Sequence, residues 1–359
     1  MSILPPVRGR GAPANQASQR FGLPVREADG DWLDVQASID DALPPLRTTV
    51  TVEHPRSILS RNTSPDLPFD QSVNAYRGCE HGCIYCYARP THAWLDLSPG
   101  LDFESRLFAK PDAAKLLRAT LRKPGYVPKV IALGTNTDPY QPIEADYRIT
   151  RDILEVCLEA RNPVAITTKS DRVLADMELL AEMARHDLVA VALSVTTLDG
   201  AIARTLEPRA ATPRKRLAAI NALAERGIPV HMNVSPVIPA ITDHEIEAVV
   251  AAGAEAGALS ASFIPVRLPH EVAPLFRAWL DAHFPDRAAK VMGIIQEMRG
   301  GRDNDPDFGT RMRGQGPWAE LIRTRFRIAL KRAGLNRHAW RLSVEGFRSP
   351  ADGMQGELF

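Results

Sequence analysis

Three of the chain's four cysteines, Cys79, Cys83 and Cys86, lie within eight residues in the spacing C-x3-C-x2-C. Four cysteines in 359 residues are too few for a disulfide framework, and three cysteines cannot pair among themselves. The surrounding segment, GCEHGCIYC, has the glycines and polar residues of a loop rather than of a core. Thiolates at fixed spacing in a loop are typical of metal chemistry.

Two kinds of metal site fit these cysteines. A structural zinc ion needs four ligands, and His81 or His92 could be the fourth, although His81 would have to reach the metal together with both flanking cysteines. An iron–sulfur cluster needs no fourth residue, because three cysteines can hold three corners of a four-iron cube and leave one iron open. Gly78 and Gly82 would allow the backbone to wrap closely around such a cluster.

The elements that position this loop follow a strand–helix alternation that begins near residue 73. Short apolar β-type runs predict strands at 72–76, 130–133, 164–168, 188–196, 228–234 and 261–266. Amphipathic segments between them predict helices at 150–160, 171–184, 212–225 and 242–256. Parallel strands need crossovers of this length, so the pattern predicts a parallel α/β sheet.

Two of the predicted strands distinguish a barrel from a flat sheet. In each, apolar residues alternate with small or polar ones, which are Ser194 and Thr196 in the fourth strand and His231, Asn233 and Ser235 in the fifth. A flat sheet covered by helices on both sides would be apolar on both faces. A polar inner face that lines a site favours an open or partial barrel.

The regions before and after this barrel differ from it in composition and in hydrophobic pattern. Residues 1–70 are rich in Pro, Arg and small polar residues and predict a mobile tail followed by an extended arm. Residues 71–268 form the predicted core barrel. Residues 269–359 predict a helical C-terminal extension, with helices at 271–284, 288–299 and 318–332.

The cysteine motif resembles that of a known family. CEHGCIYC, with Tyr85 as the aromatic residue before the last cysteine, is similar to the signature of the radical S-adenosylmethionine (SAM) superfamily. The longer string NAYRGCEHGCIYCYARP, with TTKS at 167–170 and LEPRA at 206–210, resembles its spore photoproduct lyase-like, DNA repair photolyase-related branch.

This resemblance implies a partial (β/α)6 TIM-type barrel with a [4Fe-4S] cluster on Cys79, Cys83 and Cys86. SAM would bind the open iron, and one electron would cleave it to methionine and a 5′-deoxyadenosyl radical. The radical would abstract hydrogen from a substrate that the sequence does not identify. The resemblance also implies a protein electron donor of the flavodoxin or ferredoxin type.

The resemblance further suggests which residues contact SAM. It implies Asn136 or Asp138 for the amino group, although the family's Gly-Gly-Glu form is absent there. The remaining candidates are Lys169 for the carboxylate, Ser194 for the ribose, Glu207 or Arg209 in the following loop, and Val237 and Ile238 beside the adenine. A surface ion pair explains Glu207 and Arg209 equally well.

The fourth cysteine, Cys157, lies at helical spacing beside Ile153, Leu154 and Leu158, which predicts a buried core thiol. Photoproduct lyases are thought to use a cysteine beside the substrate as hydrogen donor. No cysteine here follows a predicted strand in a position to do this, which argues against repair of thymine dimers.

Charge and hydropathy bear on the partners of the chain. The net charge of +1 gives no overall attraction to nucleic acid, and no apolar run predicts a membrane helix or a signal peptide, so we expect a cytoplasmic protein. Between residues 311 and 348, however, ten Arg or Lys face two Glu. This patch predicts contact with nucleic acid or a solvated helix face, and it leaves a second hypothesis: a nucleic-acid-binding protein with a structural cysteine-held metal.

Overall fold

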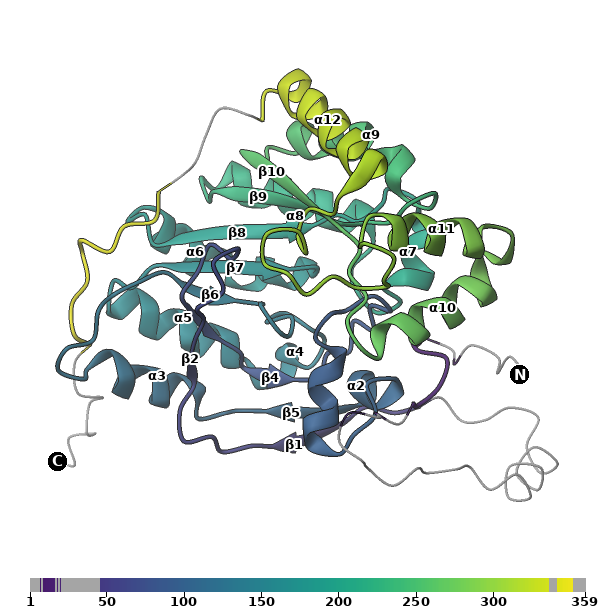
Figure 1. Ribbon diagram of the computed structural model, residues 1–359. Coiled ribbons are helices and arrows are strands. Elements are labelled where there is room, and N and C mark those ends of the chain that lie inside the picture. The colour runs from purple at the N-terminus through teal and green to yellow at the C-terminus, as the bar shows by residue number, and fades with distance from the viewer. Residues whose placement is uncertain are drawn as a thin grey trace, which may run out of the picture.

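A seven-stranded sheet forms the centre of the protein, in a computed structural model that describes residues 7, 9–16, 18, 20, 46–335 and 341–350. The strand order is β10-β9-β8-β7-β6-β3-β2 (Figure 1). The bounds are β2 (Leu59–Arg61), β3 (Gln71–Val73), β6 (Ile131–Leu133), β7 (Val164–Thr168), β8 (Val189–Ser194), β9 (Val230–Val237) and β10 (Ser260–Pro265). All neighbours pair in parallel except β2, which runs antiparallel to β3. The predicted six-stranded parallel α/β barrel is confirmed.

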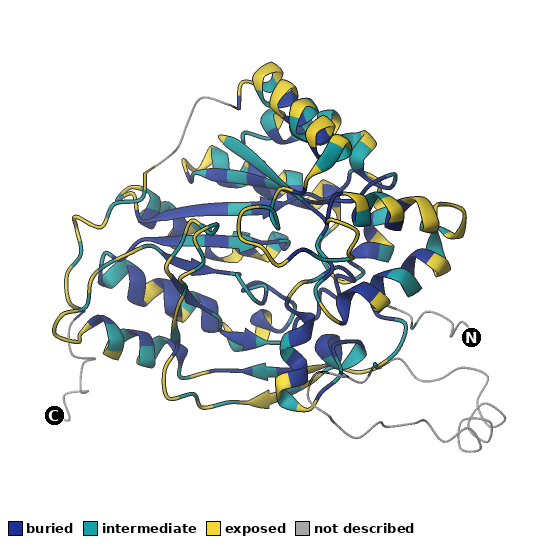
Figure 2. Cartoon of the chain, viewed as in Figure 1, coloured by how far each residue is buried: buried dark blue, intermediate teal, exposed yellow. Residues whose placement is uncertain are grey.

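The crossover helices pack on the apolar face of the sheet. They include α3 (Ala113–Leu121), α4 (Glu144–Tyr147), α5 (Ile149–Glu159), α6 (Met177–Ala184), α8 (Pro213–Glu225) and α9 (Ile246–Glu255), whereas α7 (Gly200–Leu206) packs in the apolar cluster that contains Cys83 and Ile84. Val230 and Met232 of β9 are completely buried in the core that these helices cover, and β7 and β8 in the middle of the sheet are mostly dark blue in Figure 2. The opposite face is polar: His231 contacts the hydroxyls of Ser260 and Ser262 at 2.7 and 2.8 Å. The predicted contrast between the two faces is therefore present.

Local sequence signals explain several helix boundaries. Thr212 caps α8 by accepting a hydrogen bond from the Lys215 backbone N–H, and Gly227 follows the helix with φ of +73°. The predicted helices 171–184 and 242–256 each begin as a 3₁₀ turn instead, namely η2 (Asp171–Asp176) and η3 (Asp243–Glu245). Apolar periodicity does not separate a 3₁₀ turn from the first turn of an α-helix.

The predicted strand 72–76 is wrong in one respect, because it belongs to two sheets. β3 ends at Val73, and β4 (Tyr76–Arg77) joins a second sheet with β1 (Thr49–Val52) and β5 (Arg106–Ala109), in the order β1-β5-β4. Only Asn74 and Ala75 separate the two strands, and so short an interruption in a β-type run does not reveal the change of sheet. The break positions the cysteine loop, which starts directly after β4.

The C-terminal helices pack at two places on the barrel. α12 (Gly316–Ala333) lies on α9 and β10, while α10 (Val272–His283) and α11 (Pro285–Glu297) pack at the end that carries the cysteine loop (Figure 1). Two short helices, η1 (Arg89–Leu95) and α2 (Leu101–Ser105), follow that loop. In the described part of the chain, no helix combines the length and hydropathy needed to cross a bilayer. The division at residues 70 and 268 stays a prediction.

Candidate active site

The three motif cysteines lie on one loop between β4 and η1. Cys79 and Cys83 are each 7% exposed, and Cys86 is half-buried. The loop turns back on itself twice, because the backbone N–H of Gly82 donates to Cys79 O and that of Cys86 donates to Cys83 O. Burial raises the pKa of Cys79, with further contributions from Asp138, Cys83 and Cys86. Buried thiols become stable thiolates when a cation lies beside them, so these cysteines are suited to a metal site.

Glycines make the close turns of this loop possible. Gly78 and Gly82 have φ of +73° and +68°, in the left-handed region. A Cβ at position 78 would lie 2.9 Å from Phe103 O, and one at position 82 would lie 2.7 Å from a carboxylate oxygen of Glu104. The predicted use of both glycines for close wrapping is therefore supported by their geometry.

Arg89 anchors the loop from inside, and our sequence analysis missed it. Its guanidinium is fully buried and donates to the carbonyls of Gly82 (3.1 Å) and Cys83 (2.8 Å), and it forms an ion pair with Glu104 at 2.5 Å. Two further bonds go to the carbonyls of Pro99 and Gly100. Arg89 has five partners in all, so it fixes the backbone that carries Cys83.

The two histidines offered for zinc both have other partners. His81 contacts the carboxylate of Asp138 at 3.3 Å, and His92 shares a hydrogen bond with Arg106 O while its ring meets Phe103 edge-on. Within the described ranges, no three Cys, His, Asp or Glu side chains are grouped to hold a single ion.

Asp138 joins the loop after β6 to the end of β7. It accepts hydrogen bonds from the Thr168 hydroxyl at 2.6 Å and the Lys169 backbone N–H at 2.7 Å, in addition to its contact with His81. Burial opposes its ionisation, but His81 and these hydrogen bonds lower the pKa of Asp138 to about 2. Asp138 is therefore ionised and ties the cysteine loop to two strand ends.

Lys169 brings a positive charge beside the cysteines. Its ammonium lies 5.9 Å from the centroid of the Tyr85 ring. Burial lowers its pKa, but the neighbouring Cys83 and Glu207 outweigh this effect and raise it. Lys169 is therefore a cation at the barrel mouth, as the sequence predicted from its place after the third strand.

Glu207 is a buried residue and not a surface one, so the surface ion-pair interpretation is wrong for it. Its carboxylate accepts from the hydroxyls of Tyr85 and Thr196 and forms an ion pair with Arg216, whose side chain is 1% exposed. Arg216 also donates to Ser194 O at 3.0 Å. This network connects the motif aromatic, the end of β8 and α8.

The LEPRA segment lies directly against the cysteine loop. Ile84 N donates to Leu206 O at 3.0 Å, and Arg209 N donates to His81 O at 3.3 Å. The Arg209 side chain pairs with Glu80 of the cysteine loop at 3.1 Å. Two segments that are more than a hundred residues apart in sequence therefore share one surface.

The remaining candidates also follow the carboxyl ends of parallel strands. Asn136 lies in the loop after β6, where its N–H donates to Asn74 at 3.1 Å, and Ser194 ends β8. Val237 and Ile238, at the end of β9, are fully buried. The structure thus gathers the predicted residues at one end of the barrel, while their contacts with SAM stay predictions. Cys157 is completely buried on α5 and is confirmed as a core thiol.

Comparison with known proteins identifies the family to which the chain belongs. The radical SAM superfamily model matches residues 73–252. An uncharacterized protein of Mycobacterium tuberculosis (strain ATCC 25618 / H37Rv) is 37% identical over 288 residues, which is 79% of this chain and 85% of that protein. An uncharacterized protein of Methanocaldococcus jannaschii is 32% identical over 173 residues, 48% of this chain and 62% of that protein.

Solved structures show the same fold. A spore photoproduct lyase variant aligns with a TM-score of 0.57 over 82% of both chains at 15% identity. Spore photoproduct lyase complexed with dinucleoside spore photoproduct aligns with a TM-score of 0.55 over 79% of both chains at 14% identity. At these identities the likeness concerns the fold alone. Together with the matched superfamily model and the cysteine motif, these relatives show that the chain belongs to the radical SAM superfamily.

Proposed function

We propose that this protein is a radical SAM enzyme that holds a [4Fe-4S] cluster on Cys79, Cys83 and Cys86. The observation that carries the proposal is the loop itself: three thiols on a glycine-dependent turn, locked by Arg89, at the carboxyl ends of the parallel strands. When bound, the cluster and SAM supply a 5′-deoxyadenosyl radical. The surrounding barrel excludes water from the reacting atoms.

The chain's own residues would bind and orient the cofactor. Lys169 suits the SAM carboxylate, because its ammonium stays charged beside Cys83. The Asn136 carbonyl or the ionised Asp138 suits the amino group, and Ser194 suits the ribose. Tyr85, Glu207 and Arg209 would shape the wall beside the cluster, and Val237 and Ile238 would pack against the adenine.

The experiment that tests this function uses anaerobically reconstituted protein. We expect brown protein with about four irons per chain, which on reduction converts SAM to methionine and 5′-deoxyadenosine. A flavodoxin or ferredoxin should replace the chemical reductant. Colourless protein that holds one zinc per chain would instead support the structural-metal hypothesis. We place the reaction in the cytoplasm because the chain's thiols are unpaired.

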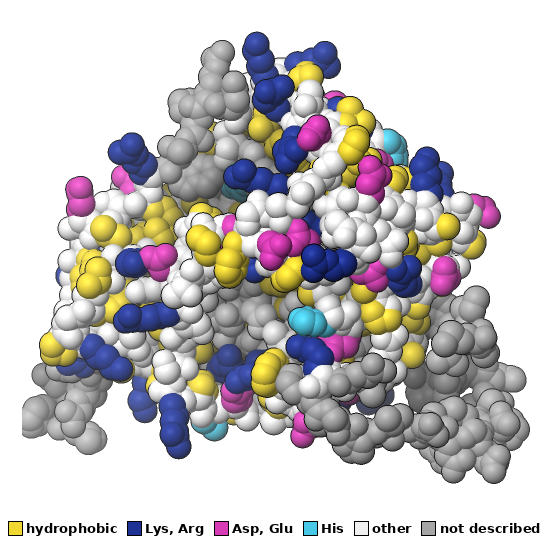
Figure 3. All heavy atoms as spheres, in the orientation of Figure 1, with side chains coloured by type: hydrophobic (Ala, Val, Ile, Leu, Met, Phe, Trp, Pro, Cys, Tyr) yellow, Lys and Arg dark blue, Asp and Glu magenta, His cyan; other side chains and the backbone are white. Residues whose placement is uncertain are grey.

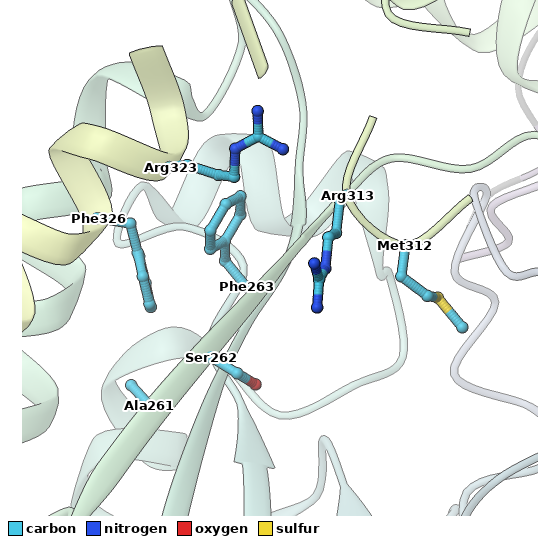
Figure 4. A pocket seen from close by; sticks show the side chains of 7 residues that line it. All are labelled: Ala261, Ser262, Phe263, Met312, Arg313, Arg323 and Phe326. Carbon is cyan, nitrogen blue, oxygen red and sulfur yellow. The ribbon is translucent and has the colours of Figure 1, made fainter. Parts of the chain in front are cut away.

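A pocket at the edge of the sheet supports nucleic acid as a partner of this enzyme. The cavity measures about 560 Å³, and its lining residues are Ala261, Ser262, Phe263, Met312, Arg313, Arg323 and Phe326 (Figure 4). This lining contains two guanidinium groups and no carboxylate. The ring centroids of Phe263 and Phe326 lie 4.7 Å apart, and the two rings form an apolar wall. Two arginines beside the half-buried ring of Phe263 suit a phosphate with a base stacked on that ring.

The charges around the pocket agree with this partner. Figure 3 shows Lys and Arg side chains gathered at the top of the molecule, where α12 lies. Arg311 pairs with Asp66 and Arg325 pairs with Glu247, so these two belong to the fold itself. Arg313 is exposed and forms no ion pair with any other residue in the described part of the chain.

Substitution of the pocket arginines should weaken binding of nucleic acid. For Arg313→Ala and Arg323→Ala we expect about five- to tenfold weaker binding of a fluorescein-labelled single-stranded oligonucleotide, with the salt slope reduced by about one unit each. Anisotropy titrations with DNA and RNA at several salt concentrations measure both. Lys123→Ala, which removes one exposed charge beyond α3 at the other edge of the sheet, is the matched control. Equal affinities for all three variants would exclude this pocket as the contact site.

A further inference from the structure

The described residues near the N-terminus cross the outer side of the cysteine loop. We call residues 9–16, together with Ser18 and Arg20, the N-terminal strap. The sequence predicted a mobile tail here, yet Arg10, Ala12 and Ser18 are buried. Ala12 belongs to the same apolar cluster as Cys83 and Ile84.

Glu104, which is fully buried on α2, connects the strap to the loop. Its two carboxylate oxygens accept from the backbone N–H groups of Gly11 (2.9 Å) and Ala12 (2.8 Å), and one of them also pairs with Arg89. Arg10 completes the connection by donating to Glu104 O at 2.6 Å. One carboxylate thus holds the strap and the arginine that fixes the loop backbone.

The contact between strap and loop is so close that only glycine fits. A Cβ at position 11 would lie 1.8 Å from Gly82 O, inside the loop between Cys79 and Cys83. Backbone atoms cannot yield as the end of a flexible side chain can. The strap and the loop are therefore matched to each other by a backbone-to-backbone approach, which a non-specific tail would not need.

Further along, the strap has two more attachments. Gln16 exchanges hydrogen bonds with the Ser98 hydroxyl, at 2.8 and 2.9 Å. Ser18 donates to Glu271 beside α10 at 2.5 Å, and Arg20 pairs with the same carboxylate. The strap thus runs from α2 across the loop to the C-terminal helices.

We infer that the N-terminal strap is part of the cluster-holding machinery, in which it covers the turn at Gly82 and Cys83 and keeps the cysteine loop closed. Its residues position the loop and do not touch the reacting atoms. With the strap displaced, the carbonyl of Gly82 and the carboxylate of Glu104 keep Arg89 but lose their contacts with Gly11 and Ala12, and water and small reagents reach Cys83. The part of this inference that concerns iron rests on the proposed function, whereas covering of the Cys83 thiol does not.

The first test uses cluster-free, reduced full-length protein and single-residue alkylation rates measured by mass spectrometry. For Gly11→Ala we expect Cys83 to react about tenfold faster than in the native sequence. The control is Gly200→Ala, which adds the same methyl group at an exposed helix start where a Cβ meets no atom within 4 Å. Cys157 should stay protected in every variant, which shows that the core is folded.

Arg10→Ala displaces the N-terminal strap in a second, independent way. It removes the guanidinium that reaches Glu104 O, Leu46 O and the Thr48 hydroxyl, and it adds no atom. If Gly11→Ala also exposes Cys157, that variant is not fully folded, and the Cys83 alkylation rate of the Arg10 variant tests the inference instead. Unchanged Cys83 alkylation in a variant with protected Cys157 overturns the inference.

The rate of iron release tests the role of the strap in holding the cluster separately from the proposed function. In reconstituted protein, a ferrous chelator should strip iron from the Gly11 variant about tenfold faster than from the Gly200 variant. If the native sequence takes up no iron, the proposed function fails while the alkylation result still stands. If iron is bound and both variants release it at one rate, the strap has no role in holding the cluster.

Discussion

Protein with Cys79, Cys83 and Cys86 replaced by alanine should emerge from anaerobic reconstitution colourless, without bound iron and without SAM cleavage. The three thiols come from one short loop, whose backbone is fixed by Arg89 and Glu104. Because no spare cysteine lies nearby, the loss of any one leaves a corner of the cluster without a ligand. Single substitutions should therefore also abolish turnover, with residual iron below one per chain. Iron analysis, the visible spectrum and assay of 5′-deoxyadenosine check this.

Cys157→Ala is the matched control, because it removes a thiol of the same size from a different place. Cys157 is completely buried on α5 among core residues, and burial raises the pKa of its thiol to about 12. We expect this variant to lose about 1 kcal/mol of stability from a small cavity and to keep its iron and its activity. Activity that survives in the triple variant, or iron loss in the Cys157 variant, would contradict the assignment of the cluster ligands.

The sequence predicted the barrel well because its signals are local. Each parallel strand is a short apolar run, and α8 has a capping threonine at one end and a glycine beyond the other. The three cysteines lie within eight residues of each other in the sequence, so their place on one loop was predictable. The switch from β3 to β4 was not, because it depends on pairing with β5, some thirty residues downstream.

The supports of the cysteine loop could not be predicted for a related reason. Arg89 stands inside the quoted motif, but its role depends on carbonyls whose direction only the folded loop defines. Gly11 appears in the sequence as one glycine of a Pro- and Arg-rich tail, and its contact with Gly82 joins segments about seventy residues apart. Glu207 looked like a surface residue because its loop is polar, although Arg216 and Tyr85 enclose it.

Glu207 and Arg216 form a buried ion pair beside the site, and its loss should have a large effect on stability. Both side chains are 1% exposed, so removal of one leaves the other charged and without its main partner. We expect Glu207→Gln or Arg216→Met to lower the free energy of unfolding by about 3–5 kcal/mol. The double variant Glu207→Gln/Arg216→Met should lose less than the sum, because it leaves no uncompensated charge. Urea denaturation of cluster-free protein at pH 7 measures all three.

The pH dependence supplies an independent check on the same pair. Burial opposes ionisation of Glu207, but Arg216, Lys169 and the hydrogen bonds lower its pKa to about 2. A carboxyl whose folded pKa lies below its unfolded value, about 4.3, stabilises the protein above that value and loses this contribution as the pH falls toward 2. The stability difference between the native sequence and Glu207→Gln should therefore shrink across this window. A constant difference, or a loss in the double variant equal to the sum of the two single losses, would show that the pair is not the buried link between Tyr85 and α8 that the geometry indicates.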